Sequence, residues 1–161
     1  MTISGVRPRL VALLITILAC VGLLSLSSAP AWALAGTIKE FPIPTKSAPI
    51  AITAGPDGNL WFTENEGGMI GRITPAGSIT EFALPTGGSF PSGITTGPDG
   101  NLWFTEENGN LIGRITPAGL FTSGFLTPTA KSRPEGITVG PDGNIWFTEE
   151  NASKIGRITT S

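Results

Sequence analysis

The sequence predicts an all-β protein, and three observations lead to that prediction. The stretch "GPDGNLWFTE" stands at 55–64, stands again at 97–106, and returns with Ile in place of Leu at 140–149. Each repeat joins turn-forming residues to a run of β-branched and aromatic residues, which favour strands. The composition of the 161 residues agrees, because 22 Gly and 14 Pro with only 14 % charged residues are typical of a turn-rich globular chain of one domain.

Each repeat is interpreted as four short strands. In the first repeat "IT" at 52–53 begins a strand, Pro-Asp-Gly-Asn forms a tight turn, and "LWFTE" follows as the second strand. A loop of variable sequence leads to "IGRIT", and a Pro-Ala-Gly turn leads to a fourth strand, "SITEFAL". Pro and Gly at several fixed points exclude a helical solenoid. The spacing of the repeats, about 42 residues, fits the four-stranded blade of a β-propeller.

About three blades are expected in a repeat domain that covers 36–161. A further strand of the fourth type is expected at 38–45, because "IKEF" matches "ITEF" at 79–82. Closed propellers typically contain about 4 to 8 blades. Three interpretations therefore remain open: a truncated chain, a homodimer that completes a six-bladed ring, and an open or strained form with three blades. The expected blade repeats are 49–90, 91–133 and 134–160.

The first 35 residues have the pattern of a secretory signal. Arg7 and Arg9 precede an uncharged apolar run at 10–26, and small residues follow at Ala33 and Ala35. We expect cleavage near one of these two alanines and export of the mature chain, either to the periplasm or to the medium. The apolar run is also close to the length of about 20 residues that spans a bilayer, so an uncleaved membrane anchor is an alternative.

Removal of the signal changes the chemistry of the chain. Cys20 is the only cysteine, so the mature chain would have neither disulfides nor thiol chemistry, unless Cys20 is retained as a lipidation site. Loss of Arg7 and Arg9 takes the formal charge from -2 to -4. A negative chain without a basic cluster excludes nucleic acid as the expected partner, and no membrane partner is expected after cleavage.

The chain has no histidine, which excludes several catalytic arrangements. Without His or a mature Cys, neither a Ser-His-Asp nor a Cys-His site can form, and the usual zinc sites are excluded as well. The residues that recur in every repeat are expected to be structural. We expect each recurring Glu to pair with the Arg eight residues later, each Asp to shape its turn, and each Trp to pack between blades. The pairs are Glu64 with Arg72, Glu106 with Arg114 and Glu149 with Arg157.

The unit "PxGITxGPDGNLWFTExxxxxIGRITPAGxxxEFxLPT" resembles the blade of the virginiamycin B lyase, or streptogramin lyase, family over 38–159. The resemblance implies a seven-bladed propeller that opens a cyclic depsipeptide antibiotic by C–O elimination, using a histidine base and Mg²⁺. It also implies that the family's histidines follow the Pro that begins a blade. Those positions here are Ile50, Ser92 and Glu135, so whether the chain is an enzyme stays open.

Candidate site residues are those in which the repeats differ. Ile50, Ser92, Arg133 and Glu135 belong to the segments that lead into the blades, and such segments gather on one face of a propeller. Catalytic candidates are Glu135 and Glu149, and candidate ligands for Mg²⁺ are Glu149 and Glu150. Two functions follow: an exported binding or scaffold module for a small molecule or peptide, or a lyase that uses a divalent cation.

Overall fold

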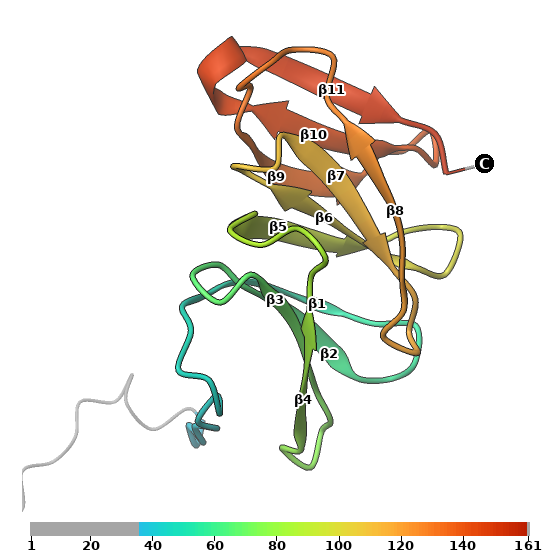
Figure 1. The fold of residues 1–161 in the computed structure, drawn as a ribbon. Coiled ribbons are helices and arrows are strands. Elements are labelled where there is room, and N and C mark those ends of the chain that lie inside the picture. Colours follow the sequence, from blue (N-terminus) through green and yellow to red (C-terminus); the bar gives the residue numbers. More distant parts are fainter. Residues whose placement is uncertain (1–35, 161) are drawn as a thin grey trace, which may run out of the picture. The chain divides into compact units, whose positions relative to one another are not determined.

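The computed structural model describes residues 36–160 (Figure 1). The chain divides into two units, Met1–Lys39 and Glu40–Ser161, and every strand belongs to the second. The predicted signal at 1–35, with Cys20, lies outside the described residues. Within the part of the chain that is described, no helix has the length and apolar character needed to cross a membrane.

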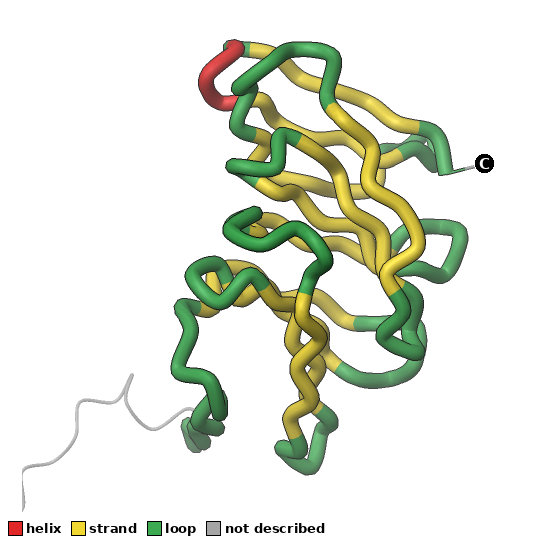
Figure 2. Tube along the Cα trace, in the orientation of Figure 1, coloured by secondary structure: helices red, strands yellow, loops and turns green. Residues whose placement is uncertain are grey.

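Eleven strands form three antiparallel sheets, with strand orders β1-β2-β3-β4, β5-β6-β7-β8 and β9-β10-β11 (Figures 1 and 2). We call these sheets blade 1, blade 2 and blade 3. A short 3₁₀ helix, η2 (Glu150–Ala152), connects β10 to β11. The all-β prediction and the three blades are confirmed. The strands are β1 (Pro49–Ala54), β2 (Leu60–Glu64), β3 (Met69–Ile73), β4 (Ile79–Ala83), β5 (Pro91–Thr96), β6 (Leu102–Glu106), β7 (Leu111–Ile115), β8 (Phe121–Leu126), β9 (Pro134–Val139), β10 (Ile145–Glu149) and β11 (Lys154–Ile158).

The segment before blade 1 differs from the expectation. Residues 36–48 contain no strand, so the strand expected at 38–45 is not formed, and the third sheet ends at β11. Pro42 and Pro44 explain the difference, because neither can donate a backbone hydrogen bond to a neighbouring strand. Phe41 nevertheless lies against Gly77, in the turn between β3 and β4.

The turn between the first two strands of each blade is held by its aspartate. In blade 1, Asp57 Oδ1 accepts hydrogen bonds from the backbone N–H of Asn59 and from Trp61 Nε1, the latter at 3.0 Å. Burial alone would raise the pKa of Asp57, but the hydrogen bonds from Asn59 and Trp61 outweigh it and lower that pKa. The turn-forming role predicted for the aspartates is confirmed.

The arginines pair with these aspartates and not with the glutamates. Arg72 Nη1 lies 3.9 Å from Asp57 Oδ2, and its guanidinium also lies 5.5 Å from the ring centre of Trp61. The hairpin register explains the correction, because Arg72 is opposite Trp61 whereas Glu64 is opposite Met69 at the far end of the hairpin. The equivalent ion pairs are Arg114 with Asp99 and Arg157 with Asp142.

Two apolar cores lie between the blades. Trp61 and Ile70 of blade 1 pack with buried residues of blade 2, and Trp103 and Ile112 of blade 2 pack in the same way on blade 3. Both tryptophans are fully buried, which confirms that they pack between blades. The residues that receive them are Ile94, Leu102, Phe104 and Ile115 in blade 2, and Ile137, Ile145, Phe147 and Ile158 in blade 3.

A threonine on the second strand joins each of the first two blades to the next. Thr105 Oγ1 accepts a hydrogen bond from the N–H of Gly93 at 2.8 Å and donates to the carbonyl of Glu135 at 2.7 Å. Thr63 makes the same two bonds, to Ala51 and to Ser92. A register shift in the first strand leaves this N–H outside the regular strand ladder. Neighbouring blades are therefore connected by hydrogen bonds as well as by apolar packing.

Candidate functional site

The leading loop, which we define as the segment just before the first strand of a blade, has a fixed backbone shape in blades 2 and 3. Phe90 and Arg133 both have φ of 52°, in the left-handed region that few residues other than glycine adopt. Their carbonyl groups accept hydrogen bonds from the N–H groups of Glu107 and Glu150, each at 3.1 Å. The loop after the second strand therefore holds the leading loop in place.

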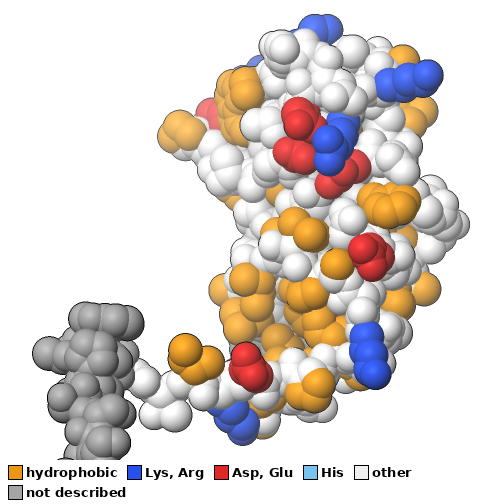
Figure 3. Space-filling view, turned by 90° about the vertical axis from the view of Figure 1, so that its left-hand side faces the viewer, with side chains coloured by type: hydrophobic (Ala, Val, Ile, Leu, Met, Phe, Trp, Pro, Cys, Tyr) orange, Lys and Arg blue, Asp and Glu red, His pale blue; other side chains and the backbone are white. Residues whose placement is uncertain are grey.

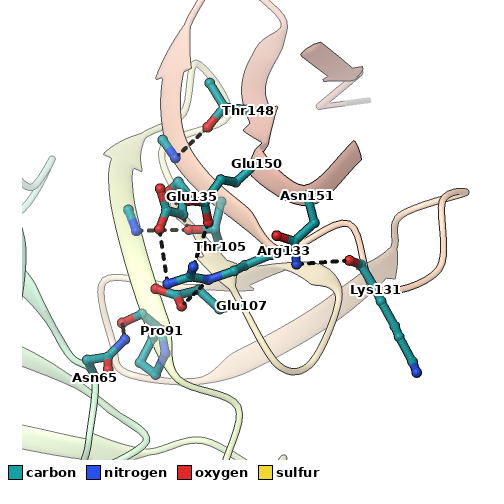
Figure 4. A network of polar contacts seen from close by, with 12 residues as sticks. Asn65, Pro91, Thr105, Glu107, Lys131, Arg133, Glu135, Thr148, Glu150 and Asn151 are labelled. Carbon is teal, nitrogen blue, oxygen red and sulfur yellow. Dashed lines mark hydrogen bonds and ion pairs between the residues drawn. The ribbon is translucent and has the colours of Figure 1, made fainter. Parts of the chain in front are cut away.

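Arg133 stands at the centre of three carboxylates, and we call these four residues the Arg133 cluster (Figure 4). Its Nε lies 3.0 Å from Glu107 Oε2, its Nη1 lies 2.6 Å from Glu150 Oε2, and its Nη2 lies 3.4 Å from Glu135 Oε1. Glu107 follows β6 in blade 2, whereas Glu135 is in β9 and Glu150 is in η2. The cluster thus joins side chains from two blades.

The carboxylates of the cluster favour the charged form of the guanidinium. The hydrogen bond and the charge of Glu107, followed by the charge of Glu150, raise the pKa of Arg133. A cavity of about 230 Å³ adjoins the cluster and is lined by Glu107, Asn108, Lys131, Arg133 and Asn151. Figure 3 shows acidic and basic side chains gathered together on one face, within a surface that is otherwise mostly uncharged. The three carboxylates outnumber the cations Arg133 and Lys131 by one.

The four candidates for the binding face do not come together. Arg133 and Glu135 are joined in the cluster, whereas Ser92 is buried and its carbonyl accepts the hydrogen bond from Thr63. Ile50 lies in blade 1 beside an apolar cavity of about 270 Å³. Equivalent positions in the repeats thus have different surroundings. Blades 2 and 3 each pack against the blade before them, whereas no described blade precedes blade 1.

The recurring glutamates at the ends of β2, β6 and β10 are buried rather than paired with arginine. Hydroxyl groups take the place of the expected cations: Thr86 Oγ1 donates to Glu106 Oε2 at 2.6 Å, and Thr45 and Ser47 donate to Glu64 Oε2. Burial raises the pKa of Glu64 and of Glu106. In the described residues one oxygen of each recurring glutamate has no hydrogen-bond partner, and Glu149 is the third of them.

The candidate ligands for Mg²⁺ do not fit a metal site. Glu149 is buried, whereas Glu150 is exposed and bound to Arg133. Within residues 36–160, no group of three or more acidic or thiol side chains is arranged to hold a metal ion. The carboxylates that do converge surround a guanidinium, which already supplies the positive charge. Glu135 and Glu149 remain catalytic candidates from the sequence alone.

Glu107 was not among the site residues predicted from the sequence, although a difference between the repeats marks its position. Glu107 and Glu150 take the position at which blade 1 has Asn65. Asn65 donates a hydrogen bond to the carbonyl of Pro91, the first residue of β5 in blade 2. This position therefore contacts the start of the next blade in both blade 1 and blade 2, at Pro91 and at Arg133. A different residue at this position therefore changes the side-chain contacts between two neighbouring blades.

These sheets, packed side by side with variable leading loops at their ends, define a β-propeller protein. The sequence model described as the virginiamycin B lyase family matches residues 31–161, and the chain therefore belongs to that family. Solved structures with low identity agree on the fold alone: the WD40 β-propeller domain of Doa1 is 13 % identical, with a TM-score of 0.56 over 68 % of this chain and 36 % of that chain.

Related proteins match with much higher identity. A virginiamycin B lyase of Saccharopolyspora erythraea is 49 % identical over 48 residues, which are 29 % of this chain and 16 % of the relative. The selenomethionine form of virginiamycin B lyase from Staphylococcus aureus is 55 % identical, with a TM-score of 0.76 over 78 % of this chain and 43 % of that chain. A catalytically inactive histidine-to-alanine variant of the S. aureus enzyme, solved with quinupristin, is 52 % identical, with a TM-score of 0.75 over 79 % of this chain and 43 % of that chain. The chain thus spans less than half the length of these relatives.

Proposed function

We propose that the chain is an exported binding module of the virginiamycin B lyase family, with its ligand site at the Arg133 cluster. The observation that supports this function most directly is the convergence of side chains from two blades beside a cavity on the leading-loop face. The leading loops and the loops after the second strands differ between the repeats, and variation between repeats usually falls on the binding face.

The surroundings of Ile50, Ser92 and Glu135, each near the start of the first strand of a blade, argue against lyase chemistry. Removal of an α-proton requires a free base within hydrogen-bond reach of the substrate. Ile50 has no proton-accepting group, Ser92 is buried, and the carboxylate of Glu135 is bound by Arg133 at 3.4 Å. The S. aureus variant that lacks one histidine is catalytically inactive, and this chain has no histidine at all. We therefore propose binding without turnover.

The chemistry of the cluster indicates the kind of ligand. The excess of carboxylates over cations favours a protonated amine or a group with several N–H donors. Asn108 and Asn151 line the same cavity with amide groups, which donate and accept hydrogen bonds. A small molecule or short peptide that carries an amine is the ligand class that this cavity suits best.

Export and binding are tested on one preparation. The full-length chain is expressed in a bacterial host, and the N-terminus of the purified product is sequenced, with Leu34 or Gly36 expected as the first residue. Binding of quinupristin and of short basic peptides is measured by calorimetry. Ring opening of quinupristin is followed by chromatography with and without Mg²⁺, because elimination leaves the mass unchanged. Binding without ring opening is expected, whereas metal-dependent ring opening would overturn the proposal.

Matched variants locate the site. Glu107→Gln and Glu135→Gln each remove one carboxylate from the cluster and should weaken binding about tenfold, the value of one charge-assisted hydrogen bond. Glu66→Gln removes the same charge from an exposed loop position in blade 1 and should leave binding unchanged. Equal affinities in all three variants would place the ligand elsewhere. If the wild-type chain does open the ring, loss of turnover in Glu135→Gln would identify the base.

A further inference from the structure

Each blade has two unlike faces, and the two junctions in the chain show how these faces fit together. We call the side that carries the Trp, the Thr and the third-strand Ile the tryptophan face; in blade 1 these residues are Trp61, Thr63 and Ile70. The opposite side is the phenylalanine face; in blade 2 it consists of Ile94, Leu102, Phe104 and Ile115. At both junctions the tryptophan face of one blade packs on the phenylalanine face of the next.

The tryptophan face of blade 3 is uncovered in the described structure. Ile155 is 65 % exposed, whereas the equivalent Ile70 and Ile112 are 0 % and 1 % exposed. Thr148 accepts the hydrogen bond from the N–H of Gly136 at 2.9 Å, as its equivalents do from theirs. In blades 1 and 2 the O–H of the equivalent threonine donates to a carbonyl of the next blade. No described blade follows blade 3 to supply this carbonyl to Thr148.

The phenylalanine face of blade 1 is uncovered in the same way. Ile52 is 62 % exposed, whereas the equivalent Ile94 is 6 % exposed, and Leu60 is exposed where Leu102 and Ile145 are fully buried. Figure 1 shows blade 1 and β11 at opposite ends of the row of sheets, so the two open faces of one chain do not cover each other. Exposed apolar faces of this kind mark sites of association.

The segment before blade 1 already occupies the place of a preceding blade. Phe82 of β4 lies against Gly119 of blade 2 and stacks on Trp61 at 5.4 Å between ring centres. Phe41 lies against Gly77 of blade 1, the position equivalent to Gly119. Phe41 is therefore held on blade 1 where a phenylalanine from the fourth strand of a preceding blade would be.

We propose that the open tryptophan face of one chain binds the open phenylalanine face of a second copy, as blade 1 binds blade 2. Blade 3 of the first chain then receives the missing elements from its partner. Phe41 of the second copy stacks on Trp146, and the carbonyl of its Ile50 accepts the hydrogen bond from Thr148. The segment that begins at Phe41 lies beside β11, which is the free edge of a three-stranded sheet.

A second copy fits this surface because the two faces are the ones that the chain joins twice within itself. The contact is heterologous, since each copy contributes a different face, and two such contacts close a ring of two copies. The described residues of two copies contain six blades, which is within the range of about 4 to 8 found in closed propellers. This association concerns the sides of the blades and is independent of ligand binding at the Arg133 cluster.

The test uses two substitutions, one on each face, in the full-length chain as the host exports it. Ile155→Glu places a charge on the tryptophan face, and Ile52→Glu places one on the phenylalanine face. Both residues are exposed in the single chain, so circular dichroism of each variant should match the wild type. Leu126→Glu, at an exposed position on the outer strand of blade 2, is the matched control. The molar mass is measured by light scattering after size exclusion.

A dimer is expected for the wild type and for Leu126→Glu, and monomers are expected for the two face variants. An equimolar mixture of Ile155→Glu and Ile52→Glu should restore a dimer, because each variant retains the face that the other needs. Phe41→Ala should weaken each of the two contacts about tenfold, the value of one aromatic pair. A monomeric wild type, a dimer that neither face variant disrupts, or a mixture that remains monomeric would each overturn the proposal.

Discussion

Replacing Thr105 with valine tests how the blades are joined. Valine keeps the size and the β-branched shape of threonine and removes only the hydroxyl group. Thr105 is fully buried, and its Oγ1 lies 2.8 Å from the nitrogen of Gly93 and 2.7 Å from the carbonyl oxygen of Glu135. The variant therefore leaves one backbone donor in blade 2 and one backbone acceptor in blade 3 without their partner.

The expected loss of stability follows from these two groups. A buried polar group that loses its partner costs about 1–3 kcal/mol, so the two together cost about 2–6 kcal/mol. Thr105→Ser is the control, because serine keeps the hydroxyl group and loses one methyl group, for about 1 kcal/mol. Urea unfolding followed by tryptophan fluorescence measures both free energies of unfolding. If serine destabilises the chain as much as valine does, packing of the methyl group and not the hydroxyl group joins the blades, and the reasoning fails.

Two further predictions concern the glycine and the glutamate of the repeat. A methyl group on Gly113 would overlap the ring of Phe104, so Gly113→Ala should cost about 1–3 kcal/mol; an unchanged melting temperature would show that the ring does not lie over Gly113. Burial raises the pKa of Glu106 above its unfolded value of 4.5, so the folded chain holds this proton more tightly than the unfolded chain does. The free energy of unfolding should therefore fall as the pH rises from the unfolded pKa through the folded pKa. For one group, the slope of the free energy of unfolding against pH is at most about 1.4 kcal/mol per pH unit, and Glu106→Gln should reduce it. Urea titrations at several pH values measure this slope, and an unchanged slope in the variant would show that Glu106 is not its cause.

The strands were predictable because their signals are local. The turn "GPDGN" and the run "LWFTE" lie within ten residues, and Asp57 holds its turn through Asn59 and Trp61, its neighbours in the chain. The partner of Arg72 was not predictable in this way. It depends on the register of the hairpin, which places Arg72 beside the turn and Glu64 at the other end.

Features that involve more distant parts of the chain were harder to predict. The strand expected at 38–45 rested on the match of four letters, and Pro42 and Pro44 beside them prevent regular pairing. The Arg133 cluster brings Glu107 of blade 2 to a leading loop of blade 3, and these residues are 26 positions apart. The sequence indicated Arg133 and Glu135 as unusual among the repeats, but only the packing of one blade on the next shows which acid joins them.

The leading loop also has a consequence for how such a protein diverges. Phe90 and Arg133 have the same φ of 52° although one side chain is aromatic and the other is a cation. In both blades the carbonyl group of this residue accepts a hydrogen bond from the N–H of the following hairpin loop, so the same backbone contact is made whichever side chain is present. The residue at this position can therefore be substituted in one blade without altering the backbone of the other blades. Duplicated blades can in this way acquire new specificities one at a time, while the parts that fold them stay the same.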